Sequence, residues 1–164
     1  SCGGNHTLAI KTNGTLWAWG WNAYGQLGLG NTTQRTSPVQ VGTDTNWASV
    51  SGGASHTLAV KTNGTLWAWG YNSYGNLGLG DTTQRTSPVQ VGTDTNWESV
   101  SCGNYHTLAF KTNGTLWAWG LNSSGQLGLG DKTQRTSPVQ VGTDTNWKFF
   151  TVTNGGSHVI KNTY

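Results

Sequence analysis

Hydrophobic and polar positions alternate along this chain in short runs that end in Gly, Asn or Pro. The clearest run is 6–20, HTLAIKTNGTLWAWG, in which Asn13-Gly14 separates two alternating segments. An Asn-Gly pair in this setting is the strongest short-range signal for a β-hairpin with a two-residue type I′ turn. The pattern therefore predicts two antiparallel strands joined at Asn13-Gly14.

The hairpin segment returns at 56–70 and 106–120, because residues 1–150 repeat every 50 residues without gaps. Each repeat adds a segment such as WASVS before the hairpin and SPVQV after it. The pattern indicates about four short strands per repeat and no helical periodicity. Four strands at this period are typical of a β-propeller blade. We predict an all-β protein of three four-stranded antiparallel β-propeller blades, with blade repeats at 1–50, 51–100 and 101–150 and a divergent closing or capping segment at 151–164.

A two-residue turn fixes the register of the predicted hairpin. It pairs Ile10 with Trp17 and Leu8 with Trp19, so these four bulky side chains share one face, and Ala9 and Ala18 share the other. The bulky face of one blade is then expected to pack on the small face of the next. The predicted inter-blade core is Leu8, Ile10, Trp17, Trp19, Leu58, Trp67, Trp69, Leu108, Trp117 and Trp119.

The two ends of the array need an explanation, because closed propellers have about four to eight blades. A partial propeller could be completed by homo-oligomerisation into a ring or a head-to-tail stack, or it could belong to a longer propeller. The segment 155–158 resembles Gly3–His6. This likeness predicts that His158 takes the place of His6, two residues later than the period requires.

Composition limits the classes of partner. Hydrophobic residues make up 34% of the chain and charged residues 9%, and the ten Trp compensate for the low apolar fraction. A net charge of +3 without a Lys/Arg run argues against a nucleic-acid partner, and no apolar run approaches transmembrane length, so no membrane partner is expected. Cys2 and Cys102 are expected to be small buried thiols that do not pair. Low charge and abundant Thr, Asn and Gly favour an extracellular or cell-surface protein.

Four motifs recur at fixed offsets in every repeat, and in the first they are Gly3–Ala9, Asn13–Gly20, Asn22–Gly30 and Ser37–Val41. With these motifs the chain resembles the regulator of chromosome condensation repeat family, in a bacterial form with near-identical repeats. The resemblance implies a β-propeller of four-stranded blades. Activities in the family include nucleotide exchange on a small GTPase, ultraviolet sensing and β-lactamase inhibition, so the repeat implies a scaffold and leaves the function to the site.

No residue set in the sequence indicates catalysis. His6, His56 and His106 are expected to hydrogen-bond backbone at a corner of each blade rather than to bind metal. Asp44, Asp94 and Asp144 are expected to make turns with their own backbone. Residues 125–133, GQLGLGDKT, do not form a phosphate loop, because Asp131 separates Gly130 from Lys132 and no helix follows. We therefore expect no enzyme activity, no cofactor and no metal.

The differences between repeats lie mostly in loops, where aromatic side chains stand beside Asn and Gln. Such loops suit recognition of a protein or a sugar. The candidate binding residues are Asn5, Trp21, Tyr24, Gln26, Ser55, Tyr71, Tyr74, Asn76, Tyr105, Leu121, Ser124 and Gln126.

These observations favour a non-catalytic repeat scaffold for protein–protein interaction or self-assembly, with another protein or a second copy of the chain as partner. One alternative is a carbohydrate-binding, lectin-like propeller with a glycan ligand. Another is a guanine nucleotide exchange factor-like activity, for which the gapless repeats leave no room for a catalytic loop. Ultraviolet sensing is not expected, because the Trp and Arg that the family's receptor places before the His are Gly4-Asn5, Ala54-Ser55 and Asn104-Tyr105 here.

Overall fold

Strands joined by turns and loops make up the whole described structure. The computed structural model describes the backbone of residues 1–152 and 157–161 and the side chains of residues 1–147. No helix in this part of the chain is long and apolar enough to cross a membrane. The strands are β1 (His6–Ile10), β2 (Leu16–Gly20), β3 (Arg35–Gln40), β4 (Trp47–Gly52), β5 (His56–Lys61), β6 (Leu66–Gly70), β7 (Arg85–Gln90), β8 (Trp97–Cys102), β9 (His106–Lys111), β10 (Leu116–Gly120), β11 (Arg135–Gln140), β12 (Trp147–Val152) and β13 (Ser157–Lys161).

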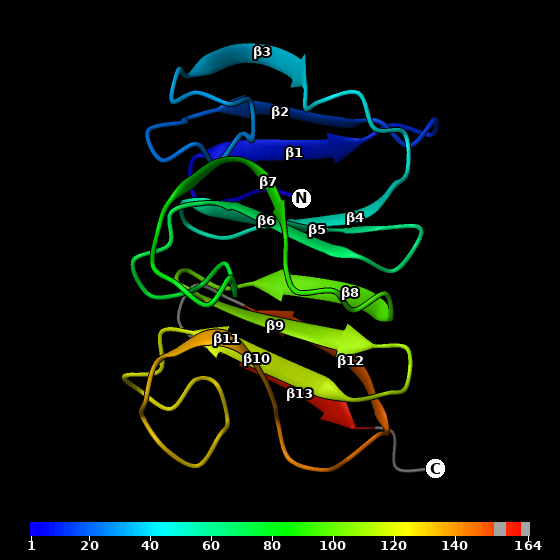
Figure 1. Ribbon diagram of the computed structural model, residues 1–164, viewed down its shortest axis with the longest axis vertical. Coiled ribbons are helices and arrows are strands. Elements are labelled where there is room, and N and C mark those ends of the chain that lie inside the picture. The colour runs from blue at the N-terminus through cyan, green and yellow to red at the C-terminus, as the bar shows by residue number, and fades with distance from the viewer. Residues whose placement is uncertain (153–156, 162–164) are drawn as a thin grey trace.

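The structure contains four antiparallel sheets, of which the first three follow one another along the long axis of the molecule, while β12 and β13 lie behind the third in this view (Figure 1). Their orders are β1-β2-β3, β4-β5-β6-β7, β8-β9-β10-β11 and β12-β13. This arrangement confirms the all-β, partial-propeller fold that the periodicity predicts. Each four-stranded sheet begins at the Trp before the hairpin, so β4 crosses the boundary between the first two sequence repeats. The first sheet has three strands and an isolated bridge between Cys2 and Thr7.

The hairpin is present, but its predicted register is wrong by one residue. Ile10 pairs with Leu16, and Leu8 pairs with Ala18. The loop has three residues instead of two, and Gly14 N donates to Lys11 O at 2.9 Å. Gly14 has φ +76°, while no described non-Gly residue has positive φ. A type I′ turn needs positive φ at both central residues, so the chain adopts the three-residue alternative that ends in a left-handed Gly.

The corrected register changes the two faces of every blade. One face carries the two Trp with Ala9 and Thr7, and the other carries Leu8 and Ile10 with Leu16 and Ala18. The Leu face of each blade packs on the Trp face of the next. The first such core joins Leu8, Leu16, Ala18, Leu27 and Val41 to Trp47, Ala59 and Trp69, and the second joins Leu58, Leu66, Ala68, Leu77 and Val91 to Trp97, Ala109 and Trp119.

The other residues of the predicted inter-blade core differ in how deeply they are buried and in the cluster to which they belong. Trp67 and Trp117 are half-buried at the edge of these cores, as is Ile10. Leu108 lies in a third cluster next to Trp147. Trp17 and Trp19 are only half-buried, because they lie on the Trp face of the first blade, which no described sheet covers.

The C-terminal strands continue the 50-residue period without an insertion. Trp147 pairs with Lys161, and Val152 pairs with Ser157. The equivalent pairs in the second blade are Trp47 with Lys61 and Gly52 with Thr57, so Ser157 occupies the position of Thr57. His158 therefore takes the place of Leu58, and its predicted equivalence to His6 is wrong. The capping role of segment 151–164 stays a prediction.

The two cysteines differ in their surroundings. Both are free, but Cys2 is exposed and only Cys102 is buried, so the prediction of two buried thiols is wrong for Cys2. Burial raises the pKa of the Cys102 thiol to about 12, and its Sγ lies 3.4 Å from Ser51 O in the preceding blade. The Cys102 thiol is therefore protonated near neutral pH and fills space between two blades.

Candidate functional site

The loop after the second hairpin strand forms the surface in which the repeats differ most. In the first blade it begins at Trp21, and buried Asn22 holds it in shape. The Asn22 side chain donates to Asn31 O at 2.9 Å and to Thr33 O at 3.0 Å, and it accepts from Leu27 N at 2.9 Å. Asn72 and Asn122 make the same contacts in the next two blades. These loops are therefore fixed supports, although the sequence alone did not single out the three Asn.

Gln26 and Asn76 shape the loops from inside. Both are 0% exposed, so their predicted role in binding a partner is wrong. Gln26 Oε1 accepts from Tyr24 N at 2.9 Å, and Asn76 Nδ2 donates to Tyr71 O at 2.6 Å. Gln126 is half-buried, and its Oε1 accepts from Ser124 N at 2.9 Å. All three amides stabilise the backbone beneath the loop surface.

The backbone carbonyl of Gln26 joins the first two blades. It accepts from Thr57 Oγ1 at 2.8 Å and from Trp69 Nε1 at 2.9 Å. Asn76 O accepts in the same way from Thr107 Oγ1 and Trp119 Nε1. The loops of the first two blades are thus anchored to the next blade through main-chain oxygen atoms, which do not depend on the outward side chains.

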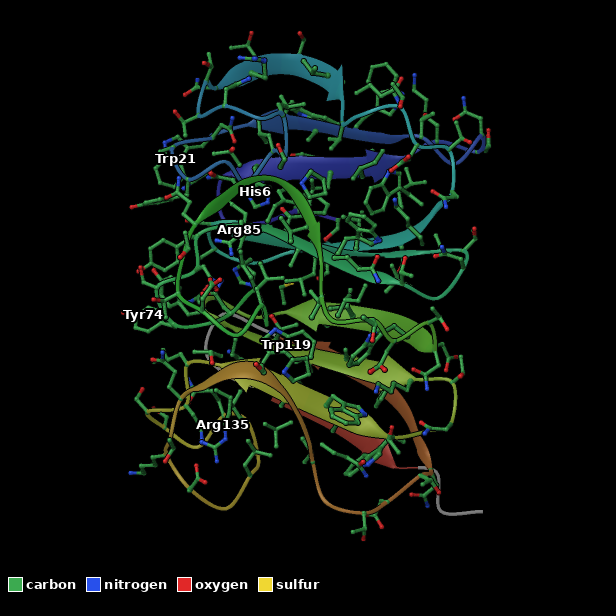
Figure 2. The ribbon with its side chains drawn as sticks, viewed as in Figure 1. His6, Trp21, Tyr74, Arg85, Trp119 and Arg135 are labelled. Carbon is green, nitrogen blue, oxygen red and sulfur yellow. The ribbon has the colours of Figure 1, made fainter. Side chains whose placement is uncertain are left out.

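The aromatic candidates come together in one continuous group, which we call the aromatic row. Centroid distances between adjacent rings run from 5.0 to 6.1 Å, with interplanar angles from 55° to 88°. Trp21 and Tyr74 lie on the same side of the molecule (Figure 2). Trp21 is 36% exposed and is the one large hydrophobic side chain at the surface of the described residues. The members of the row are Trp21, Tyr24, Tyr71, Tyr74 and Tyr105.

The other candidates add no ring to the row. Asn5 and Ser55 occupy the position of Tyr105 in the first two blades, where Asn5 is exposed and Ser55 is half-buried. Leu121 and Ser124 take the places of Tyr71 and Tyr74 in the third blade, with Leu121 half-buried and Ser124 exposed. The row therefore crosses the first two blades, reaches the corner of the third at Tyr105, and ends there.

Charged residues begin where the row loops end. Asp81 Oδ2 lies 2.6 Å from Arg85 in an exposed ion pair, and Asp131 repeats this pair with Arg135. The Thr83 backbone amide, with Arg85 and Asn72, holds the pKa of Asp81 below its usual value. The first blade has Asn31 in place of the Asp, so the Arg35 guanidinium donates to Thr33 O and Gln34 O and pairs with no carboxylate of the described residues.

His6, His56 and His106 form a buried line through the blades. His6 Nε2 lies 3.0 Å from Thr57 Oγ1 in the next blade, so its partner is a side chain rather than the predicted neighbouring backbone. The Thr57 hydroxyl already donates to Gln26 O, so it accepts from His6, which places the proton on Nε2. Burial lowers the pKa of His6 and His106 to about 4. Burial, and then the neighbouring His6 and His106, lower that of His56 to about 3.

A lysine lies between two indole rings at the opposite end of the hairpin. Lys61 Nζ is 3.9 Å from the ring centroid of Trp67 and 4.7 Å from that of Trp47. It also forms a 2.7 Å ion pair with Asp44. Lys111 and Asp94 repeat this arrangement in the third blade. The prediction that Asp44 and Asp94 form turns by hydrogen-bonding their own backbone is therefore wrong, because the carboxylate of each forms an ion pair with a lysine of the next blade.

Two clefts open between blades beside these lysines. The larger measures about 520 Å³ and is lined by Trp67, Pro88 and Asp44, among others. The equivalent cleft one blade further on measures about 320 Å³. Among the described residues, no group of three His, Cys, Asp or Glu side chains could hold a metal ion. The aromatic row and the two clefts are thus the candidate sites at the surface of the described residues.

A family model described as RCC1-like domain matches residues 1–161. The chain belongs to the RCC1-like domain family. This RCC1-like chain is 51% identical over 41 residues to the ultraviolet-B receptor UVR8 of Arabidopsis thaliana, a match that covers 25% of the chain and 9% of the receptor. It is 55% identical over 42 residues to the protein RCC2 homolog of Xenopus laevis, which covers 25% of the chain and 8% of that protein.

Solved structures share the fold of the RCC1-like chain. Prp20p from Saccharomyces cerevisiae, described with its binding to Gsp1p and histones, superposes with a TM-score of 0.82 at 21% identity. Yeast RCC1 (Prp20) in complex with Kap60 superposes with a TM-score of 0.85 at 22% identity. Each match covers 99% of the RCC1-like chain and 43% or 42% of the other chain, so the chain spans less than half the length of Prp20 in both structures.

Proposed function

We propose that this chain is a non-catalytic scaffold that binds another protein through the aromatic row. The observation that carries the proposal is the continuity of the row, because five rings from three blades meet on one surface. Tyr and Trp are the residues most enriched at protein interfaces and at their energetic centres. The RCC1-family structures described with Gsp1p, histones and Kap60 support a protein as the ligand class.

The alternatives find less support in the geometry. An exchange factor needs a distinctive loop, whereas the loops after β2, β6 and β10 have the same length in all three blades. A glycan commonly stacks on an open, flat ring, whereas the rings of the row meet each other at steep angles. A protein partner therefore remains the function that this surface supports best.

The chain itself supplies the substitutions that test this proposal. Tyr24→Ser, Tyr71→Leu and Tyr74→Ser each introduce the residue that the third repeat carries at the same position, so the loop should keep its shape. A displayed library of random peptides is selected on the unaltered protein and then on this triple variant. Binders that require the row support the proposal, and a library that yields none overturns it.

Exchanges away from the row provide the matched control. Glu98→Ala and Asp81→Asn also introduce residues from the first repeat, where Ala48 and Asn31 stand. The selected peptides are expected to bind this double variant with unchanged affinity. Equal loss in both variants would show that the peptides do not bind the row.

Self-association is a second candidate, favoured by the open Trp face of the first blade. Ala9 and Trp19 are half-buried there, whereas Ala59 and Trp69 are 0% exposed beneath the preceding blade. We propose that a second copy covers this apolar face. Light scattering on the 17.5 kDa chain should then give at least twice that mass, and Ala9→Arg should restore the monomer. A monomer before any substitution would overturn this second proposal.

A further inference from the structure

We propose that the aromatic row binds an uncharged, proline-rich peptide segment in the extended polyproline II conformation. The proposal rests on the proposed function and names the chemical class of the partner. Four observations carry it: the neutrality of the surrounding loops, the tilt of the rings, the free tyrosine hydroxyls and the length of the row.

The loops that carry the row contain no charged side chain. Neither the corners at 2–5, 52–55 and 102–105 nor the loops at 20–30, 70–80 and 120–130 include Asp, Glu, Lys or Arg. Beyond these loops, Asp81 is paired with Arg85 and Asp131 with Arg135, while the charges of Arg35 and Lys132 lie outside the loops that carry the rings. A ligand charge placed over the rings themselves would lose hydration without meeting an opposite charge in these loops. The matching partner segment is therefore uncharged.

The rings lie at steep angles to one another rather than forming one flat platform. Trp21 meets Tyr24 at 88°, and Tyr24 meets Tyr71 at 70°. Tyr71 and Tyr74 are tilted by 55° and 57° against Tyr105. Where the edge of one ring meets the face of the next, the exposed surfaces form a corner against which a compact, rigid prolyl ring can pack. Grooves lined with aromatic rings are the surfaces on which proline-rich segments dock.

The tyrosine hydroxyls supply the polar part of the recognition. Tyr24, Tyr71, Tyr74 and Tyr105 are half-buried, and their hydroxyls make no hydrogen bond to the described residues and are not enclosed. Each can therefore donate to a ligand oxygen. A polyproline II segment has no internal hydrogen bonds, so all its carbonyl oxygens are available as acceptors. The hydroxyl donors of the protein are thus complementary to a polyproline II segment, which offers carbonyl acceptors and has no N–H donor at its prolines.

The length of the row fits a short segment. From Trp21 through Tyr24 and Tyr71 to Tyr105, the centroid steps are 5.4, 5.0 and 5.8 Å. Polyproline II rises about 3.1 Å per residue, so the row accommodates at most about five residues. The conformation exists before binding, which lowers the entropy lost when the segment is ordered on a rigid surface.

Calorimetric titration of the 164-residue chain with acetylated, amidated decaproline tests this inference. A Gly-Ser peptide of the same length is the matched uncharged ligand that lacks the conformation. We expect decaproline to bind and the Gly-Ser peptide to bind at least about tenfold more weakly. Tyr71→Leu should lower the decaproline association constant about tenfold, since it removes the ring at the centre of the row. Tyr71→Phe should lower it by less, and Glu98→Ala should leave it unchanged.

The outcomes separate this inference from the proposed function. If library peptides bind the row but decaproline does not, the row is a protein site and the proline-rich class is wrong. If decaproline binds equally well to Tyr71→Leu and to the triple variant, it binds elsewhere and the inference fails. If a linear β-linked glucose hexasaccharide binds in a Tyr71-dependent manner while peptides do not, the row is a glycan site and both proposals fail.

Discussion

Acid should destabilise this chain steeply, because its described histidines are buried in the neutral form. The folded chain holds the pKa of His6 and His106 at about 4 and that of His56 at about 3. In the unfolded chain a histidine has a pKa near 6.5. Below that pH the unfolded chain binds protons that the folded chain does not, so the free energy of unfolding must fall as pH falls.

The size of the effect follows from the shifts. One pKa unit corresponds to about 1.4 kcal/mol, so each histidine removes about 2 kcal/mol of stability between pH 7 and 5. The three together remove about 6 kcal/mol, which is comparable to the whole stability of many domains. Asp81 and Asp131 do not contribute in this window, because their pKa values are lowered in the folded chain and their effect appears only at lower pH.

Urea unfolding followed by Trp fluorescence at several pH values measures this loss. All measurements use a protein that carries His158→Gln, so that His6, His56 and His106 are the only histidines left to titrate. His6→Gln keeps an N–H donor for Thr57 Oγ1 and removes one titrating group, so the loss between pH 7 and 5 should shrink by about one third. A stability that changes by less than about 1 kcal/mol over this range would refute the reasoning, as would an unchanged slope in His6→Gln.

Two further substitutions test the contacts between blades. Asp44→Asn should destabilise the chain by about 1–3 kcal/mol in urea unfolding, because the Lys61 side chain is 8% exposed and would lose its ion pair. Asp81→Asn, which breaks an exposed pair, should change stability by no more than about 0.5 kcal/mol, and equal costs would contradict this difference. Gly78→Ala should cost more than Gly92→Ala, by about 1 kcal/mol or more in thermal unfolding. Both Gly have positive φ, but a Cβ at Gly78 would lie 2.8 Å from Trp119 Nε1, whereas a Cβ at Gly92 meets nothing within 4 Å.

The strand content and the stacking of blades could be predicted because they depend on short-range signals. The Asn-Gly pair indicates a turn, and the alternation of hydrophobic and polar residues indicates strands. The 50-residue period repeats both signals in each blade. The register could not be predicted from the same signal, because Asn13-Gly14 fits a two-residue or a three-residue loop. The choice depends on which residue adopts positive φ, and only Gly14 does. That one-residue difference moved Leu8 away from the face that carries Trp17.

Part of the candidate site could also be predicted, from the differences between repeats rather than from strand and turn signals. Positions that vary between repeats pointed to Trp21, Tyr71 and Tyr105, whose rings the structure brings into one row. The same variation also pointed to Gln26, whose side chain is buried under the loop. Variation alone does not distinguish an outward position from an inward one. The pairing of Asp44 with Lys61 was missed because it joins two blades, and no local pattern encodes a contact over 17 residues.

The anchoring of each loop through the main-chain oxygen of residue 26 or 76 has a consequence for how such a protein can change. A carbonyl oxygen is the same in every residue, so mutation of the loop side chains does not remove the bond that joins two blades. Positions 21, 24, 71 and 74 can therefore accumulate substitutions at little cost to folding, much as the loops of an antibody do. The blade array is thus a ready framework for a combinatorial library, in which a new specificity is selected at the loops while the stack beneath them stays constant.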